Sequence, residues 1–289
     1  MNLREETIAI LNKYGLRANK KLGQNFLINE EIITSIVEKA EITKNDVVIE
    51  IGPGLGSLTK ELFNNAKKVI EIELDANMID ILKSRFGIYD NFEVIYADVL
   101  KVDLQELIKD YDSVKVVANL PYYITTPIIM KLLEDKLKIK SITVMVQKEV
   151  GERICSSYKD KEYGAITVSV QYYSEPKIII DVPKDNFIPA PEVDSCVIKL
   201  EMLEEPRVKV NDEKLFFRTV KGAFSQRRKT INNSLTCTGK SKDEIKIILD
   251  KLNIDEKLRA ENLSIEQYAD IVNMLWNGGR KWLIIGMYL

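Results

Sequence analysis

The tetrapeptide Asn119-Leu120-Pro121-Tyr122 has residue types that suit chemistry on the exocyclic amine of an adenine base. This amine is a poor nucleophile because its lone pair is delocalised into the ring. Two acceptors, the Asn119 side-chain oxygen and the Leu120 carbonyl, can bind its two N–H groups and favour a pyramidal nitrogen aimed at an activated methyl group. Pro121 stiffens the backbone that presents these acceptors, and the Tyr122 ring offers a face for stacking a flipped base.

A second aromatic residue, Phe187, lies in the segment 186–191, which two prolines stiffen. Its ring could stack on the face of the base opposite Tyr122, although an isolated phenylalanine beside prolines is also a common core residue. The chain contains no histidine, which excludes imidazole bases and the Ser-His-Asp and Cys-His nucleophile pairs. Methyl transfer needs none of these groups, because it is an in-line displacement after which the proton can leave to solvent.

A glycine-rich turn, Gly52-Pro53-Gly54-Leu55-Gly56, lies between a predicted strand and a predicted helix. Glycines allow a tight turn and let the backbone approach a ligand closely, and the helix N-terminus that follows favours an anionic group. The spacing is G-x-G-x-G and differs from the G-x-G-x-x-G pattern of dinucleotide-binding proteins. Gly52 and Gly54 are therefore candidates for contacts with a nucleoside cofactor.

Two acidic residues at the ends of the next predicted strands extend this cofactor site. Glu73 ends the second strand about 20 residues after the glycines, where it can accept hydrogen bonds from ribose hydroxyls. NAD and S-adenosylmethionine both carry that ribose, so Glu73 does not distinguish them. Asp98 ends the third strand and can accept a hydrogen bond from an adenine amine, whereas dinucleotide dehydrogenases need no acid there. Glu73 and Asp98 together therefore favour S-adenosylmethionine over NAD as the cofactor.

These residues lie at the ends of short runs rich in valine and isoleucine that alternate with helical patterns. Continuously apolar strands are typical of a parallel sheet that is covered on both faces, and the alternation predicts right-handed βαβ connections. The fold class is therefore α/β, a doubly wound, mostly parallel Rossmann-like sheet of the class I methyltransferase type. Strands are expected at 46–51, 69–73, 92–96, 114–119 and 142–147, and helices at 57–66, 76–86, 103–110, 126–136 and 148–157.

The pattern changes after residue 160. Residues 163–173 fit either a strand or a helix, whereas 177–182 and 195–202 predict a β-hairpin that completes the far edge of the sheet with antiparallel strands. We expect the methyltransferase domain to span residues 1–205.

The remaining chain predicts short helices. Ser241 with Glu244, and Ser264 with Gln267, form capping-box patterns ahead of apolar runs. A smaller, all-helical RNA-binding domain is therefore expected at 206–276. Residues 277–289 are expected to form a tail to which no role is assigned. The Gly-Gly pair at 278–279 is expected to interrupt the helical structure there.

Positive charge is concentrated in two runs, although the chain as a whole is slightly acidic, with a net charge of -2 and a pI of about 5.6. The segments 13–24 and 218–230 contain several basic residues and no acid. Such runs are often only solvated faces, yet a local concentration of positive charge also recruits phosphates. The candidates for RNA contacts are Lys20, Lys21, Arg227, Arg228 and Lys229.

Other features of the composition exclude several classes of protein. Cys155, Cys196 and Cys237 lie far apart and form no CxxC pair, which argues against a disulfide framework and a zinc site, so no metal is expected. No run approaches the roughly 18 apolar residues of a membrane span, and the N-terminus is unlike a signal or transit peptide. A monomeric cytoplasmic protein that does not engage a membrane is the expectation.

Eight ordered sequence blocks resemble the bacterial small-subunit ribosomal RNA adenine N6,N6-dimethyltransferases, the enzymes whose loss gives kasugamycin resistance. The blocks fall within residues 3–275 and are GQNFL (23–27), EIGPGLG (50–56), IELD (72–75), NLPYYI (119–124), QKEV (147–150), FIPAPEVDS (187–195), AFSQRRKT (223–230) and ENLSIEQY (261–268). The resemblance implies four methyl transfers to two adjacent adenines in a hairpin near the 3′ end of 16S rRNA. It also implies action on an immature small ribosomal subunit, late in its assembly.

The resemblance also assigns roles to individual residues. It implies that the cofactor is contacted by Asn25, Leu27, Gly52, Glu73, Asp98 and Asn119. Tyr122 and Phe187 correspond to the base-stacking aromatics of the family, and the loop 24–27 is implied to close over the cofactor. Glu192 stands where a lysine is common in the family.

Three other functions remain as alternatives. The macrolide-resistance methyltransferases of large-subunit (23S) rRNA share the Asn-hydrophobic-Pro-Tyr motif and the fold, but the blocks at 223–230 and 261–268 favour the small-subunit enzymes. An RNA-binding assembly factor without methyl transfer is disfavoured by the intact motif at 119–122. An NAD-dependent oxidoreductase is disfavoured by the glycine spacing and by Asp98.

Overall fold

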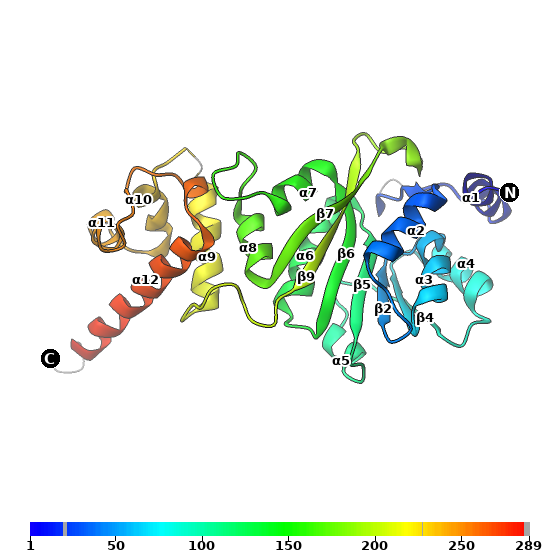
Figure 1. Cartoon of the computed structure of the whole chain (residues 1–289), viewed down its shortest axis with the longest axis horizontal. Coiled ribbons are helices and arrows are strands. Elements are labelled where there is room, and N and C mark those ends of the chain that lie inside the picture. Colours follow the sequence, from blue (N-terminus) through cyan, green and yellow to red (C-terminus); the bar gives the residue numbers. More distant parts are fainter. Residues whose placement is uncertain (20–21, 227, 286–289) are drawn as a thin grey trace. The chain divides into compact units, whose positions relative to one another are not determined.

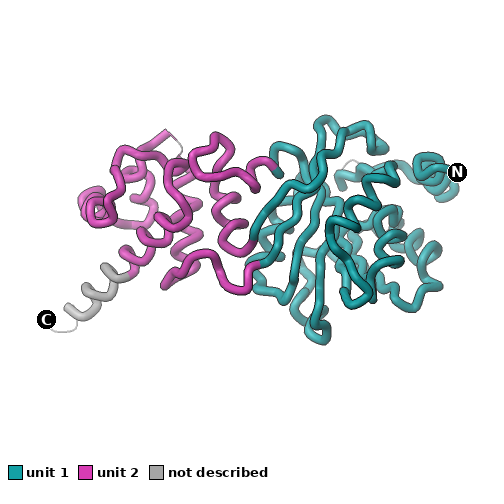
Figure 2. Tube along the Cα trace, in the orientation of Figure 1, with its two compact units in different colours: residues 1–151, 175–202 teal, residues 152–174, 203–289 magenta. Residues whose placement is uncertain are grey.

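The computed structural model describes residues 1–19, 22–226 and 228–285. The chain forms two compact units, coloured separately in Figure 2. The first unit contains Met1–Gly151 and Glu175–Met202, and the second contains Glu152–Ser174 together with the chain from Leu203 onward. Residues 152–174, expected from the sequence within the first domain, therefore belong to the second unit.

The first unit is built on a seven-stranded sheet with the strand order β4-β3-β2-β5-β6-β9-β7 (Figure 1). The strands from β4 to β6 are parallel to their neighbours, and β9 is antiparallel to β6. The expected fold class is thus confirmed, and β9 and β7 complete the far edge of the sheet as expected. The strands are β2 (Val47–Ile51), β3 (Lys68–Glu73), β4 (Phe92–Tyr96), β5 (Val114–Asn119), β6 (Ile139–Gln147), β7 (Ser174–Val182) and β9 (Ser195–Met202).

Helices cover both faces of the central strands. Successive residues of a strand point to opposite faces, and every residue of β2 is buried. On one face, Val48 packs in a hydrophobic cluster with Ile36 and Leu62, which belong to neighbouring helices. The helices of this unit are α1 (Leu3–Lys13), α2 (Glu30–Lys39), α3 (Ser57–Asn65), α4 (Ala76–Phe86), α5 (Leu104–Ile108), α6 (Thr125–Glu134) and α7 (Lys148–Cys155), which extends into the second unit.

Two short strands bring distant segments together in the first unit. β1 (Phe26–Leu27) pairs antiparallel with β8 (Phe187–Ile188), so that Leu27 lies opposite Phe187. Two short 3-10 helices, η2 (Tyr122–Ile124) and η3 (Lys184–Asn186), follow β5 and precede β8 respectively.

The second unit is helical. It contains α8 (Ala165–Tyr173), α9 (Glu213–Ser225), α10 (Ile231–Ser234), η4 (Leu235–Thr238), α11 (Lys242–Lys251), η5 (Ala260–Asn262) and α12 (Ile265–Ile285). The ambiguous segment 163–173 is therefore helical over most of its length. The Tyr172 ring of α8 lies 5.1 Å from the Phe216 ring of α9, centroid to centroid. This aromatic contact explains why α8 packs with the helical unit.

Hydrogen bonds fix the helix starts that the sequence predicted in this unit. Ser241 and Glu244 form a capping box at α11, and Ser264 and Gln267 exchange the corresponding bonds at α12. By contrast, the predicted break at 278–279 is wrong, because α12 continues to Ile285. Glycine inside a helix costs only about 1 kcal/mol relative to alanine, which lowers helix stability without ending the helix. No helix in the described part of the chain has the length and apolar character of a membrane span.

Candidate functional site

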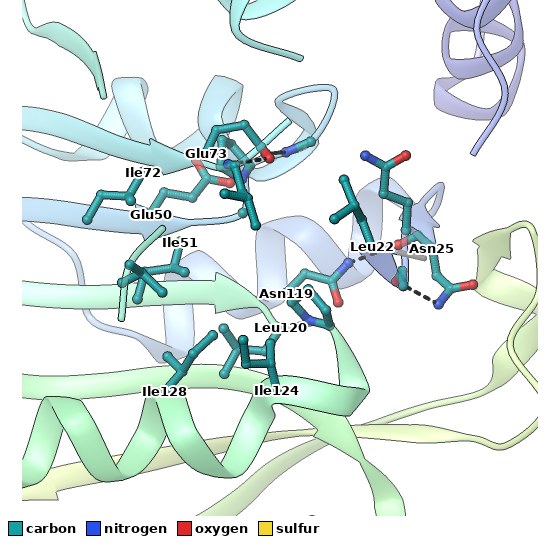
Figure 3. A pocket seen from close by; sticks show the side chains of 18 of the residues that line it. Leu22, Asn25, Glu50, Ile51, Ile72, Glu73, Asn119, Leu120, Ile124 and Ile128 are labelled. Atoms are coloured by element: carbon teal, nitrogen blue, oxygen red, sulfur yellow. Dashed lines mark hydrogen bonds between the residues drawn. The ribbon is translucent and has the colours of Figure 1, made fainter. Parts of the chain in front are cut away.

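A cavity opens at the carboxyl ends of β2, β3, β4 and β5, where parallel strands deliver their last residues to one edge of the sheet (Figure 3). Its lining includes most of the residues that the sequence singled out, namely Asn25, Leu27, Gly52, Gly54, Glu73, Asp98, Asn119, Leu120 and Tyr122. All of them belong to the first compact unit. The structure therefore brings the predicted cofactor residues into one cavity with Asn119, Leu120 and Tyr122, but not with Phe187, the fourth predicted catalytic residue.

Gly52 and Gly56 are required for different reasons. Both have a positive φ, +67° and +79° respectively, which favours glycine. A Cβ on Gly56 would clash with the Phe86 ring, so this glycine is needed for packing between α3 and α4. A Cβ on Gly52 would meet no atom within 4 Å, because this residue faces the open cavity. Gly52 thus leaves space in which a ligand can approach the backbone closely.

The Glu73 carboxylate is held rigidly at the wall of this cavity. Its Oε2 accepts a hydrogen bond from Gly54 N at 3.1 Å, and its Oε1 accepts from Leu74 N and Asp75 N, both at 2.8 Å. Burial raises the pKa of Glu73, and the backbone hydrogen bonds act in the opposite direction. A carboxylate offers about four acceptor positions, so acceptor capacity remains for a ribose hydroxyl.

Asp98 is fixed in a similar way at the end of β4. Its Oδ1 accepts a hydrogen bond from Leu100 N at 3.0 Å, and Lys101 Nζ lies 3.5 Å from its Oδ2. The Lys101 side chain is exposed, so this ion pair holds the carboxylate only weakly. Asp98 can therefore offer an acceptor to an adenine amine at this side of the cavity.

The Asn119 amide is oriented by the loop that covers the cavity. Its Nδ2 donates to the Asn25 carbonyl oxygen at 3.0 Å, as drawn in Figure 3. Among the described residues, no hydrogen bond reaches Asn119 Oδ1. The donor side of the amide is thus engaged, whereas the oxygen remains available as an acceptor beside Leu120.

Tyr122 is positioned by a hydrogen bond between its hydroxyl and Ser195 Oγ, at 2.7 Å. The side chain is half-buried, and this burial raises the pKa of the phenol. The ring therefore has a fixed place at the wall of the cavity, directly after the two acceptors.

The loop 22–27 closes one side of the cavity through several contacts. Gln24 Nε2 donates to Asp75 Oδ2 at 2.8 Å, and Asn25 Nδ2 donates to the Gly23 carbonyl at 3.2 Å. Asp75 is also the N-cap of α4, so the loop is tied to the same strand end that carries Glu73. In the sequence, only the family resemblance indicated that this loop closes over the cofactor, because the spacing of its residues matches no general binding motif.

Phe187 does not line this cavity. Its side chain is only 3% exposed and packs in a hydrophobic cluster with Leu27 and Val197. The pairing of β8 with β1 buries the ring, and this pairing joins segments about 160 residues apart in the chain. The expected stacking of Phe187 on a base therefore does not match its position here and would need the ring to be uncovered.

A buried carboxyl pair adjoins the cavity, and the sequence assigned no role to either member; Glu50 lines the cavity, whereas Glu71 does not. Glu50 on β2 and Glu71 on β3 lie opposite each other in the parallel register, with 1% and 0% of their surfaces exposed. Thr59 Oγ1 donates to Glu50 Oε2 at 2.7 Å, whereas neither carboxyl oxygen of Glu71 has a hydrogen-bond partner in the described residues. Burial raises the pKa of Glu50 to about 8 and that of Glu71 to about 9.

We expect Glu71→Gln to stabilise the protein, and to do so more at high pH. In the unfolded chain Glu71 ionises above its ordinary pKa, but in the folded chain it stays protonated up to about pH 9. The wild type therefore loses stability as pH rises from about 4.5 to 9, because the unfolded state releases a proton that the folded state retains. The variant lacks this loss and should gain of the order of 5 kcal/mol in unfolding free energy at pH 8, with little difference at pH 4.5.

Urea unfolding of both proteins across this pH range measures the effect. Glu38→Gln, at an exposed position of α2, is the matched control and should show no comparable pH dependence. A gain for Glu71→Gln that stays constant from pH 4.5 to 8 would contradict the assignment of a raised pKa.

The predicted RNA-contacting residues are only partly described. Lys20, Lys21 and Arg227 lie outside the described residues, whereas Arg228 and Lys229 are exposed in the second unit after α9. Within the described residues, no group of three or more histidine, cysteine or acidic side chains is arranged to hold a metal ion.

Comparisons with known proteins place the chain among RNA methyltransferases. A family model described as ribosomal RNA adenine dimethylase matches residues 15–277. The chain is 50% identical over 277 residues to a protein of Clostridium botulinum (strain Kyoto / Type A2) named ribosomal RNA small subunit methyltransferase A, covering 96% of this chain and 99% of that protein. A protein of the same name from Clostridium acetobutylicum is 48% identical over 270 residues, covering 93% and 98% of the two chains.

Two solved structures share the fold. A dimethyladenosine transferase from Plasmodium falciparum has a TM-score of 0.76 and 28% identity, over 88% of this chain and 98% of that one. The 23S rRNA methyltransferase ErmE has a TM-score of 0.67 and 26% identity, over 87% and 99% of the two chains.

Proposed function

Because the chain belongs to the ribosomal RNA adenine dimethylase family, we propose that it dimethylates the N6 atoms of two adjacent adenines in the 3′-terminal hairpin of 16S rRNA. S-adenosylmethionine is the methyl donor. The observation that carries this function is the geometry of Asn119, whose amide donates to the Asn25 carbonyl and keeps its oxygen available in the cavity.

The cavity suits the proposed cofactor on several counts. Gly52 leaves open space beside the backbone, and Glu73 and Asp98 present fixed carboxylates at neighbouring strand ends. Glu73 would bind the ribose hydroxyls and Asp98 the adenine amine, with Asn25 and Leu27 contributed by the covering loop. The bound cofactor supplies a methyl group activated by its sulfonium sulfur.

The residues after β5 would hold the substrate base. Asn119 Oδ1 and the Leu120 carbonyl accept the two N–H groups of the adenine amine, and Tyr122 stacks on the base. This geometry localises the lone pair of the nitrogen for in-line attack, so positioning and electrostatics provide the catalysis. The proton of the methylated amine passes to solvent, and no side-chain base is needed. Phe187 would complete the stack only after its ring leaves the hydrophobic cluster.

The macrolide-resistance function on 23S rRNA is not favoured. The relatives that are about half identical over nearly the whole chain are named for the small subunit, whereas ErmE is 26% identical. The preserved acceptor geometry of Asn119 also argues against an assembly factor without catalysis. We place the protein in the cytoplasm as a metal-free monomer that acts on an immature small subunit.

Mapping of methylated adenosines tests the function. Immature small subunits, mature small subunits and large subunits are incubated with the protein and labelled S-adenosylmethionine, and the modified positions are located by mass spectrometry. We expect N6,N6-dimethyladenosine at two adjacent positions near the 3′ end of 16S rRNA. Modification confined to 23S rRNA would establish the alternative, and transfer to neither RNA would refute both.

We also expect Arg228→Gln combined with Lys229→Gln to weaken RNA binding. Each phosphate contact contributes about one unit to the slope of log affinity against log salt concentration, so the slope should fall by one to two units. Titration of RNA binding between 50 and 200 mM salt, about the range over which this term is large, measures it. Lys242→Gln with Lys257→Gln, two exposed lysines outside the basic run, is the matched control. An unchanged slope for the first pair would show that those residues form only a solvated face.

A further inference from the structure

Tyr123 is an exposed aromatic residue in the lining of the same cavity, and no motif assigned it a role. Its side chain is 59% exposed. Two of the other exposed tyrosines have covered rings: Tyr89 stacks on Phe63 with centroids 5.1 Å apart, and Lys159 Nζ lies 4.9 Å from the Tyr158 centroid. Tyr96 is also exposed and has no such ring contact in the described residues, but it does not line the cavity. Within the described residues, Tyr123 has no aromatic partner, no cation over its ring and no hydrogen bond to its hydroxyl. An apolar π-face is thus left open at the mouth of the cavity.

Tyr123 cannot share a base with Tyr122. Both residues lie in η2, a 3-10 helix with about three residues per turn, so consecutive side chains point in directions about 120° apart. Tyr122 is held by Ser195, as described above. Tyr123 instead lies against the covering loop, because a Cβ on Gly23 would come within 3.3 Å of its Cδ1 atom. One edge of the Tyr123 ring therefore lies next to Gly23, while Tyr123 as a whole remains largely exposed.

We propose that Tyr123 stacks the nucleobase that neighbours the adenine being methylated. This inference rests on the proposed function, in which the substrate presents two adjacent adenines. Drawing one adenine into the cavity separates it from its neighbour and breaks their stacking. An open aromatic ring at the cavity mouth replaces that stacking with a contact that tolerates any base.

Three substitutions of Tyr123 separate stacking from loop packing. Tyr123→Phe keeps the aromatic face, Tyr123→Leu keeps apolar bulk against Gly23 without a π-face, and Tyr123→Ala removes both. Tyr96→Leu is the matched control, because Tyr96 is 64% exposed at the end of β4 but does not line the cavity. Affinity for S-adenosylmethionine, measured by calorimetry, reports whether the covering loop is intact in each variant.

Fluorescence gives the direct readout. An RNA hairpin carries two adjacent adenines in its loop, with 2-aminopurine in place of one of them, and stacking on an aromatic ring quenches its emission. We expect quenching by the wild type, Tyr123→Phe and Tyr96→Leu, and its loss with Tyr123→Leu. The KM for small subunits should rise about tenfold in Tyr123→Leu, because the variant loses one base–aromatic stack, while the KM for the methyl donor stays unchanged.

The outcomes distinguish this inference from the function on which it rests. If the wild type dimethylates both adenines and Tyr123→Leu matches it in quenching and in KM for small subunits, the stacking role is refuted while the function stands. A raised KM of Tyr123→Leu for small subunits with unchanged quenching would mean that the ring contacts a ribosomal protein, and it would overturn the proposal. Absence of 2-aminopurine quenching by the wild type would overturn it as well. Absence of any adenine methylation by the wild type would instead refute the proposed function.

Discussion

Asn119→Ala should lose methyl transfer while retaining RNA binding. The substitution removes the oxygen that accepts an N–H of the adenine amine, and it also removes the hydrogen bond to the Asn25 carbonyl. Removing one preorganised hydrogen-bonding group of this kind typically lowers the turnover number by about 10²–10³-fold, and the second lost bond should place this variant at the upper end. Single-turnover transfer of labelled methyl groups to small subunits measures the loss, and filter binding measures RNA affinity.

Asn65→Ala is the matched control for this variant. Asn65 carries the same side chain on α3, but its amide bonds only to Glu61 in the described structure and it does not line the cavity. Turnover by Asn65→Ala should stay near that of the wild type. Comparable turnover by Asn119→Ala would overturn the catalytic assignment. A parallel loss of RNA affinity would show that the residue acts in binding and not in transfer.

Gly52→Ala should sharply reduce affinity for S-adenosylmethionine. The added methyl group would project into the space where the glycine turn faces the cavity, since no protein atom lies within 4 Å of it. It would therefore occupy room that a ligand needs for close approach to the backbone. We expect the dissociation constant for S-adenosylmethionine, measured by calorimetry, to rise at least tenfold, or by about 1.4 kcal/mol.

Gly15→Ala provides a closely matched control. Gly15 has φ +63°, close to the +67° of Gly52, and a Cβ there also meets no atom within 4 Å. Both substitutions impose a similar backbone strain of about 1–3 kcal/mol and should lower Tm by similar amounts. Only Gly52 lines the cavity, so only its variant should lose cofactor affinity. Equal cofactor affinity in the two variants would mean that the glycine turn does not contact the cofactor.

The parts of the site that depend on strand order were predictable from the sequence. Apolar runs identified β2 to β5, and right-handed connections between parallel strands place their carboxyl ends at one edge. Gly52, Glu73, Asp98 and Asn119 each follow or end one of these strands. Their meeting in one cavity follows from local patterns together with a general rule of α/β topology.

The parts that depend on packing between distant segments were decided only by the tertiary structure. The burial of Phe187 requires β8 to pair with β1, and the assignment of 152–174 to the helical unit requires α8 to meet α9. Likewise, an acid inside an apolar strand does not reveal that Glu71 faces Glu50 or that it lacks a hydrogen-bond partner.

The physical reason lies in the range of the interactions. Hydrophobic periodicity and turn residues act over a few positions and are written in the local sequence, so the strands, the glycine turn and the motif at 119–122 could be identified without a structure. Which ring is covered, which carboxyl group is left without a partner and which tyrosine stays exposed depend on side chains far away in the chain. Because the motifs are local, the residue types alone were enough to determine the chemistry expected of this protein. Packing decided that Phe187 lies in the core and that Tyr123 stands open at the cavity mouth.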